Sequence, residues 1–144
     1  MSLSHSGVCT IRRKSFDERS RESRLMLEKY PNRIPVIVER KNDYAPRIDK
    51  TKFMVPRTLT CAEFIAVVRQ RMRLTNAGSS ENAGSSENAG SSAELGSQAL
   101  LFFIDAGSPR PLLCGHTPMG DMYAKFRSDD AFLYTLYETE NAFG

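Results

Sequence analysis

The stretch LTCAEF at residues 59–64 decides the fold. Thr60 and Glu63 form a capping box, in which the threonine oxygen and the glutamate carboxylate each satisfy a backbone N–H at the start of a helix. Leu59 and Phe64 have the spacing of a hydrophobic staple around the same start. Apolar side chains then recur with helical spacing over the following turns. The pattern predicts a helix that begins here.

Two extended segments precede this helix. Residues 33–39 are β-branched and apolar, and Pro31 disfavours helical geometry just before them. A second short strand is predicted at residues 52–55, and Pro56 closes it because proline cannot donate to a strand ladder. The polar turn at residues 42–50 joins the two runs. They therefore predict a β-hairpin.

A further helix is predicted upstream of the hairpin. Ser15 and Glu18 form a second capping box, which favours a helix running to about Lys29. Residues 1–14 are polar and irregular, and we expect a mobile arm or a weakly docked segment there.

A low-complexity repeat follows the central helix. The sequence Asn-Ala-Gly-Ser-Ser-Glu at residues 76–81 recurs at residues 82–87 and, shortened, at residues 88–92. It has almost nothing to bury and its period is too short for a solenoid. We therefore expect residues 76–98 to be a disordered loop insertion, which costs little stability because closure entropy grows by roughly 0.6 kcal/mol per doubling of length.

Three elements are predicted after the repeat. Residues 99–104 are wholly apolar, as in a buried strand. Thr117 offers an N-cap and Pro118 a first helical position, so residues 119–126 are predicted to form a short helix. Residues 132–137 are apolar on both faces, as a central strand is.

This order of elements predicts an α+β fold of one domain, residues 15–139. Two strands, a helix that crosses the sheet, and later strands that return to the middle of the sheet make the ubiquitin-like β-grasp. We expect a four-stranded mixed sheet with an N-terminal helical extension.

Composition limits the function classes. The 144 residues suit one small domain, and the longest apolar run is too short to cross a bilayer, so we expect a cytoplasmic protein. Lys and Arg outnumber Asp and Glu by 17 to 8 in residues 1–74, whereas the ratio is 3 to 9 in residues 75–144. This asymmetry favours a basic face for acidic peptides or anionic lipids.

Nothing resembles a nucleic-acid-binding motif, and no nucleic acid partner is expected.

Chemistry-bearing side chains are sparse. Cys9, Cys61 and Cys114 are too few and scattered for a disulfide framework, and we interpret them as packing residues. Cys114 and His116 stand close together but lack a second ligand cluster, so no metal site is predicted. No Cys, His and carboxylate set is recognisable. We expect no catalytic residue, no cofactor and no enzymatic activity.

Five short segments of the sequence resemble those of a known protein family. They are Lys29-Tyr30-Pro31-Asn32-Arg33-Ile34-Pro35-Val36-Ile37-Val38-Glu39, Ile48-Asp49-Lys50, Lys52-Phe53-Met54-Val55-Pro56, Phe132-Leu133-Tyr134 and Glu140-Asn141-Ala142-Phe143-Gly144. Together they closely resemble the autophagy-eight (GABARAP-like) family of ubiquitin-like modifiers, over nearly the whole chain except the repeat. Phe53 and Met54 stand where relatives commonly have Tyr and Leu, and Ala131 replaces a common glycine.

The resemblance implies conjugation through the C-terminal glycine, Gly144, to phosphatidylethanolamine. Activating, conjugating and deconjugating enzymes of the autophagy system would be its partners, and the conjugate would lie on autophagosomal membranes. Residues 140–144 would form a flexible conjugation tail, and the chain from Glu138 onward would have to stand free of the fold. Two alternatives stay open, a modifier of protein amines and an unconjugated peptide-binding adaptor.

The resemblance also implies recognition of receptor peptides with an aromatic-x-x-aliphatic motif, which would add a strand to the edge at residues 52–55. The residues expected to line the aromatic pocket are Glu22, Met26, Pro35, Ile37, Lys52, Met54 and Phe132. Those expected to line the aliphatic pocket are Phe53, Val55, Pro56, Leu59, Phe64 and Val67. Lys50, Lys52 and Arg71 would attract acidic residues before the motif. Without the resemblance, the apolar members are interpreted as core and the cations as a solvated face.

Overall fold

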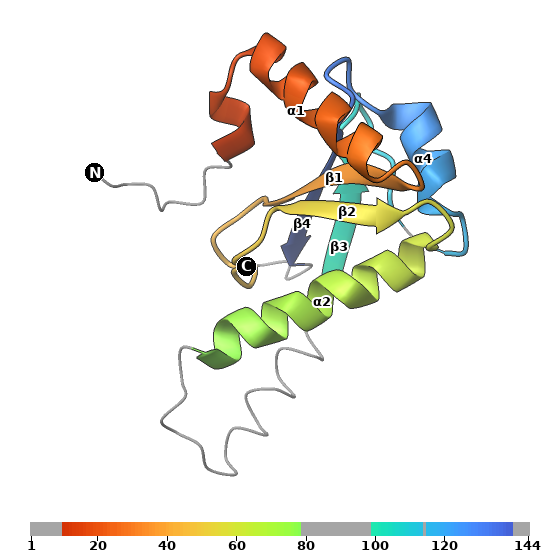
Figure 1. Cartoon of the computed structure of the whole chain (residues 1–144). Coiled ribbons are helices and arrows are strands. Elements are labelled where there is room, and N and C mark those ends of the chain that lie inside the picture. The colour runs from red at the N-terminus through yellow and green to blue at the C-terminus, as the bar shows by residue number, and fades with distance from the viewer. Residues whose placement is uncertain (1–9, 79–98, 114, 140–144) are drawn as a thin grey trace.

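The computed structural model describes residues 10–78, 99–113 and 115–139 (Figure 1). Its elements in chain order are η2 (Thr10–Arg13), α1 (Phe16–Lys29), β1 (Arg33–Arg40), β2 (Lys52–Pro56), α2 (Cys61–Gly78), β3 (Leu100–Ile104), α4 (Met119–Phe126) and β4 (Leu133–Thr139). None of the helices within these ranges is long and apolar enough to cross a membrane.

The four strands form one mixed sheet in the order β2-β1-β4-β3. β1 pairs antiparallel with β2 and parallel with β4, and β3 pairs antiparallel with β4. The last strand of the chain therefore lies in the middle of the sheet, beside the first. This arrangement confirms the predicted ubiquitin-like α+β fold with a four-stranded mixed sheet.

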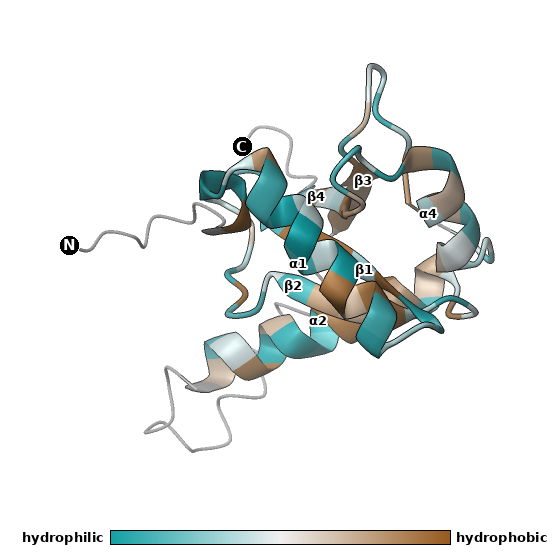
Figure 2. Ribbon diagram, turned by 45° about the horizontal axis from the view of Figure 1, so that its top comes forward, coloured by the Kyte–Doolittle hydropathy of each residue, from teal (hydrophilic) through white to brown (hydrophobic). Residues whose placement is uncertain are grey.

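The larger core lies between the sheet and α2, which crosses one face (Figures 1 and 2). Phe64 and Val68 on α2 are fully buried against strand residues such as Val36. The Phe53 and Phe64 rings meet edge to face, with centroids 6.0 Å apart. Aromatic pairs prefer this geometry, and burying such side chains is the main source of stability.

A smaller core lies on the opposite face, under η2 and α1. Its buried members are Ile11, Ile37, Phe132 and Tyr134, with Met26 packed against them. Ile11 is only 2% exposed. Of the two expectations for residues 1–14, the mobile arm is wrong for Thr10–Arg13, which is docked on the sheet through Ile11 and leads into α1. Residues 1–9 lie outside the described part.

The predicted helices and strands are confirmed, with changes at their ends. Both predicted capping boxes are present, in α1 and at Thr60. The predicted cap at Thr117 is wrong: Pro118 is the N-cap of α4 and no side chain caps it. The Thr117 carbonyl instead accepts a hydrogen bond from the Cys61 N–H at 2.9 Å, which ties this segment to the start of α2.

The loop insertion also begins later than expected. α2 includes residues 76–78, because the Asn76 side-chain amide donates to the Met72 carbonyl at 2.7 Å and to the Arg47 carbonyl at 3.1 Å. The remaining residues of the predicted insertion, 79–98, are outside the described ranges.

The end of the domain differs as well. Glu138 and Thr139 continue β4 and pair with Leu101 and Leu100. The expectation that the chain stands free from Glu138 onward is therefore wrong, because β3 offers these two residues a partner strand. Residues 140–144 are not among those the structure describes.

Ala131 adopts a backbone conformation that favours glycine. Its φ angle is 71°, in the left-handed region where a Cβ atom is unfavourable. The residue lies in the turn before β4, where its N–H donates to the Ser128 carbonyl at 2.9 Å. Its carbonyl accepts the Tyr123 hydroxyl at 2.7 Å. A glycine would adopt this conformation without strain.

Candidate functional site

The β2 edge is the side of the sheet where another strand can be added. The opposite edge, at β3, is covered by the segment after it. Ile104 N–H donates to the Pro111 carbonyl at 2.8 Å, and Leu113 N–H donates to the Phe102 carbonyl at 2.7 Å. β2 has one strand neighbour, β1, in the part of the chain that the structure describes. An incoming peptide strand would therefore pair with β2.

The backbone of β2 alternates between its two sides. Val38 N–H donates to the Thr51 carbonyl at 2.8 Å, which fixes the phase of the antiparallel ladder with β1. The ladder bonds of β2 then belong to Phe53 and Val55, whereas the N–H and C=O of Met54 point away from β1. Pro35, the partner of Met54 in the register, tolerates this position because no N–H is needed there.

The side chains of β2 alternate too, and this separates the two predicted pockets. Lys52 and Met54 point to the face that carries α1, while Phe53 and Val55 point to the face that carries α2. The aromatic-pocket set therefore lies toward α1, and the aliphatic-pocket set lies toward α2. The edge strand stands between them, so one added strand would reach both.

On the α1 side, Glu22 forms ion pairs with two lysines. Its carboxylate accepts from Lys14 Nζ at 2.8 Å and from Lys52 Nζ. Below this network, Met26 packs against Ile37 and Phe132, both of which are fully buried. Pro35 is buried as well. Of the predicted aromatic set, Glu22, Met26, Lys52 and Met54 are partly exposed. Pro35, Ile37 and Phe132 form the buried floor.

On the α2 side, the predicted aliphatic set divides in the same way. Phe64 is 0% exposed, Val55 3% and Phe53 6%, so all three side chains belong to the hydrophobic core. Pro56 and Val67 are exposed and Leu59 is half-buried. A ligand can therefore contact Pro56, Leu59 and Val67 directly, whereas it would meet the aromatic core only after a rearrangement.

The predicted cations are engaged within the chain. Arg71 forms two hydrogen bonds to the Asp49 carboxylate, at 2.7 and 3.3 Å, and this contact holds the pKa of Asp49 below its usual range. Lys50 Nζ lies 5.0 Å from the centroid of the Phe53 ring. An acidic peptide residue that binds Arg71 must therefore compete with Asp49. Sequence reasoning missed this competitor, although Asp49 stands directly beside Lys50.

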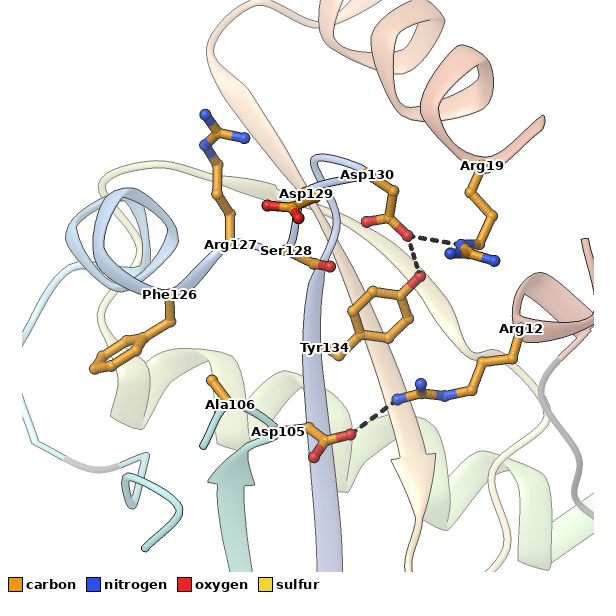
Figure 3. A pocket seen from close by; sticks show the side chains of 10 residues that line it. All are labelled: Arg12, Arg19, Asp105, Ala106, Phe126, Arg127, Ser128, Asp129, Asp130 and Tyr134. Carbon is orange, nitrogen blue, oxygen red and sulfur yellow. Dashed lines mark hydrogen bonds and ion pairs between the residues drawn. The ribbon is translucent and has the colours of Figure 1, made fainter. Parts of the chain in front are cut away.

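A polar cavity of about 480 Å³ lies behind the sheet, between η2, α1 and the loop before β4 (Figure 3). The guanidinium of Arg12 lies 4.5 Å from the Tyr134 ring centroid and pairs with Asp105 at 2.9 Å. Arg19 and Tyr134 both donate to Asp130. These side chains pair with one another, so the cavity fastens the N-terminal helices to the body. Sequence reasoning missed them because their contacts join distant segments.

Among the residues with described side chains, no group of three or more His, Cys, Asp or Glu could hold a metal ion. Cys61 is buried in the larger core. Gly144 lies outside the described ranges, and β4 leads toward it as far as Thr139. Within the described ranges, the feature that a ligand strand could use is thus the edge of β2.

Comparison with known proteins agrees with this architecture. A family model described as "Autophagy protein Atg8 ubiquitin like" matches residues 18–80. The chain is 36% identical to autophagy-related protein 8 of Schizosaccharomyces pombe over 132 residues, which cover 90% of this chain and 88% of that protein. It is 34% identical to autophagy-related protein 8h of Arabidopsis thaliana, with 90% of each covered.

Comparison with solved structures identifies the same type of protein. The crystal structure of Trypanosoma brucei ATG8 superposes with a TM-score of 0.66 at 28% sequence identity, covering 91% of this chain and 93% of that one. Sequence relatives and three-dimensional fold therefore agree over nearly the whole length of the proteins compared. The chain belongs to the Atg8 family of ubiquitin-like autophagy proteins.

Proposed function

We propose that this chain is a non-enzymatic modifier whose Gly144 is conjugated to phosphatidylethanolamine. Family membership and the Phe143-Gly144 word support the proposal. Activating and conjugating enzymes of the autophagy system attach the chain, and a deconjugating enzyme releases it. The free form is cytoplasmic, and the lipid-linked form lies on autophagosomal membranes during autophagosome formation.

The chemistry accounts for a terminal glycine. Its carboxylate is a poor electrophile until ATP converts it to an acyl adenylate with release of pyrophosphate. An enzyme thiol then displaces AMP to give a thioester, and the lipid amine displaces the thiol to give an amide. Glycine lacks a Cβ atom, so its carbonyl is open to each attack. The catalytic groups belong to the enzymes, and this chain supplies the acyl group.

The same chain recruits receptors through β2. The observation that carries this part is the outward backbone of Met54 on an edge strand whose side chains serve both faces of the sheet. A peptide strand added there would place its aromatic residue toward Met26 and Met54. Three positions later, its aliphatic residue would lie toward Leu59 and Val67.

The deciding experiment is reconstitution. The chain is incubated with activating and conjugating enzymes, ATP and liposomes containing phosphatidylethanolamine, and the product is analysed by mass spectrometry. We expect the mass of one phosphatidylethanolamine less one water, located on the peptide that contains Gly144. The Gly144→Ala variant should give no such product.

Two other outcomes separate the alternatives. A branched peptide, with Gly144 linked to a lysine of another protein, would identify a modifier of protein amines. If Gly144→Ala left membrane puncta intact in cells while the β2 variants removed them, the chain would be an unconjugated adaptor. Either result would refute lipid conjugation as its main role.

A further inference from the structure

One end of the molecule gathers the final residues of β4 and the β1–β2 loop. Lys41 N–H donates to the Tyr137 carbonyl at 2.8 Å, and the Tyr137 hydroxyl donates to the Pro46 carbonyl at 2.5 Å. The Lys41 ammonium also lies 3.8 Å from the carboxylate of Glu138. The loop therefore lies directly beside the place where β4 leaves the sheet.

The last turns of α2 reach the same end (Figure 1). The Asn76 side chain donates to the Arg47 carbonyl at 3.1 Å, and Asp49 N–H donates to the Thr75 hydroxyl at 3.1 Å. We define the exit face as five side chains that the loop and the end of α2 present here. They are Lys41, Tyr44, Arg47 and Leu74, which are exposed, and Arg73, which is half-buried. The loop also exposes Asp43, which pairs with Arg40 at 3.6 Å.

The exit face leaves two large apolar side chains in water. Tyr44 is 73% exposed, the highest fraction among the large hydrophobic residues of the described ranges, and Leu74 is 57% exposed. Arg47 and Arg73 form no ion pair with any residue in the described ranges, in contrast to Arg12, Arg19 and Arg71. Cations next to an exposed aromatic and an exposed aliphatic side chain match the chemistry of an anionic membrane surface.

We propose that the exit face contacts the anionic phospholipids of the membrane to which the chain is attached. This inference rests on the proposed conjugation of Gly144. Residues 140–144 span at most about 18 Å when fully extended, so an attached lipid would hold this end of the domain close to the headgroups. Tyr44 and Leu74 enter the interface between headgroups and acyl chains, and Arg47 and Arg73 bind the phosphates.

The contact also fixes the orientation of the recognition edge. Lys52, at the start of β2, follows the loop of the exit face, whereas Pro56 lies at the far end of the strand. With the exit face on the membrane, β2 runs away from the surface. Its edge then stays open to receptor peptides from the cytoplasm.

The test uses a tether that needs no conjugating enzyme. The full chain carries a histidine tag directly after Gly144, and vesicles of phosphatidylcholine with a nickel-chelating lipid capture it, with or without phosphatidylserine. The sequence contains no tryptophan, so Tyr44→Trp supplies a single reporter. The matched control is Tyr30→Trp, because Tyr30 is 38% exposed and precedes β1 at the opposite end of the sheet.

On vesicles with phosphatidylserine, we expect the emission of the Tyr44→Trp protein to shift to the blue and to be quenched by brominated acyl chains. The Tyr30→Trp protein should change in neither respect. Adding Arg47→Gln and Arg73→Gln should lower the equilibrium constant for insertion roughly 25-fold, about fivefold for each cation. Circular dichroism of each variant checks that the domain stays folded.

Three results would overturn the inference: no quenching of either reporter, equal quenching of both, or quenching that is independent of the two arginines and of phosphatidylserine. Because the tag replaces the enzymatic link, such a result leaves the conjugation of Gly144 untouched. Conversely, absence of a conjugate in the reconstitution would refute the proposed function without changing this vesicle measurement.

Discussion

Arg19 Nε donates a hydrogen bond to Asp130 Oδ2 at 2.8 Å, and this contact fastens α1 to the loop before β4 (Figure 3). The same oxygen accepts the Tyr134 hydroxyl at 2.6 Å, and the other carboxylate oxygen accepts the Phe132 N–H at 3.0 Å. The Asp130 side chain is only 2% exposed. Removing its charge would therefore leave three donors, one of them a guanidinium, poorly satisfied.

Asp130→Asn should lower the free energy of unfolding by about 3 kcal/mol, the lower end for breaking a buried ion pair, because Arg19 keeps some contact with water. The asparagine amide keeps one acceptor oxygen and its NH₂ group accepts no hydrogen bond, so either Arg19 and Tyr134 or the Phe132 N–H loses its acceptor. Urea denaturation measures the change. The matched control is Asp129→Asn, an exposed neighbour, for which we expect less than about 0.5 kcal/mol. Equal effects of the two substitutions would show that the contact contributes nothing specific.

The edge strand allows its backbone to be tested separately from its side chain. Met54→Ala removes the side chain that points toward α1, and Met54→Pro also removes the N–H that points away from β1. The ladder bonds of Phe53 and Val55 remain in both variants. We expect Met54→Pro to bind an aromatic-x-x-aliphatic peptide about 10-fold more weakly than Met54→Ala, the effect of about one hydrogen bond.

Isothermal titration calorimetry with one such peptide measures the difference. Met54→Ala with Lys52→Ala should weaken binding further without unfolding the domain. Identical affinities for the alanine and proline variants would mean that the peptide does not pair with the β2 backbone. Unfolding of the Met54→Pro variant would instead contradict the phase of the ladder that Val38 and Thr51 define.

Local signals are sufficient to predict α1, α2, α4 and the four strands, because each capping box and apolar run acts within a few residues. They do not predict the short helix η2. Contacts between distant segments were not predictable in this way. Ile11 docks on Ile37 and Phe132, but no pattern near Ile11 indicates a partner sheet. The same limit explains why the residues at the end of β4 were expected to stand free, since their partner strand begins at Leu100.

The candidate site shows the same division. The alternation of β2 could have placed Lys52 and Met54 on the face opposite Phe53 from sequence alone. The burial of Phe64 at 0% exposure and the Asp49 carboxylate on Arg71 depend on how α2 crosses the sheet. A resemblance between sequences names the residues of a groove, but it does not say which of them a ligand can reach.

Ala131 gives a stabilising prediction. Its φ of 71° costs a residue with a Cβ atom about 1–2 kcal/mol. Glycine avoids this strain, but it loses more backbone entropy on folding than alanine does, which offsets part of the gain. Ala131→Gly should therefore raise the free energy of unfolding by about 0.5–1 kcal/mol. Ala124→Gly is the matched control, since Ala124 is exposed within α4 and should lose about 1 kcal/mol. Thermal denaturation with the same sign for both variants would contradict the strain at Ala131.

Two tyrosines link stability to high pH. Burial raises the pKa of Tyr137, and burial together with the hydrogen bond to Asp130 raises the pKa of Tyr134 above the ordinary value of about 10. The unfolded chain therefore loses these phenolic protons at lower pH than the folded chain does. Their contribution to stability is complete below about pH 10 and is lost as the pH rises toward the folded values.

We expect the melting temperature to fall above about pH 10, and the tyrosinate absorbance of Tyr134 and Tyr137 to appear only together with unfolding. Tyr137→Phe keeps the ring packed on Phe102 but removes one ionisable group and its bond to the Pro46 carbonyl. This variant should be less stable at neutral pH and should lose stability less steeply in alkali. An unchanged slope would mean that Tyr137 ionises equally in both states, because the slope counts only protons that the two states hold differently.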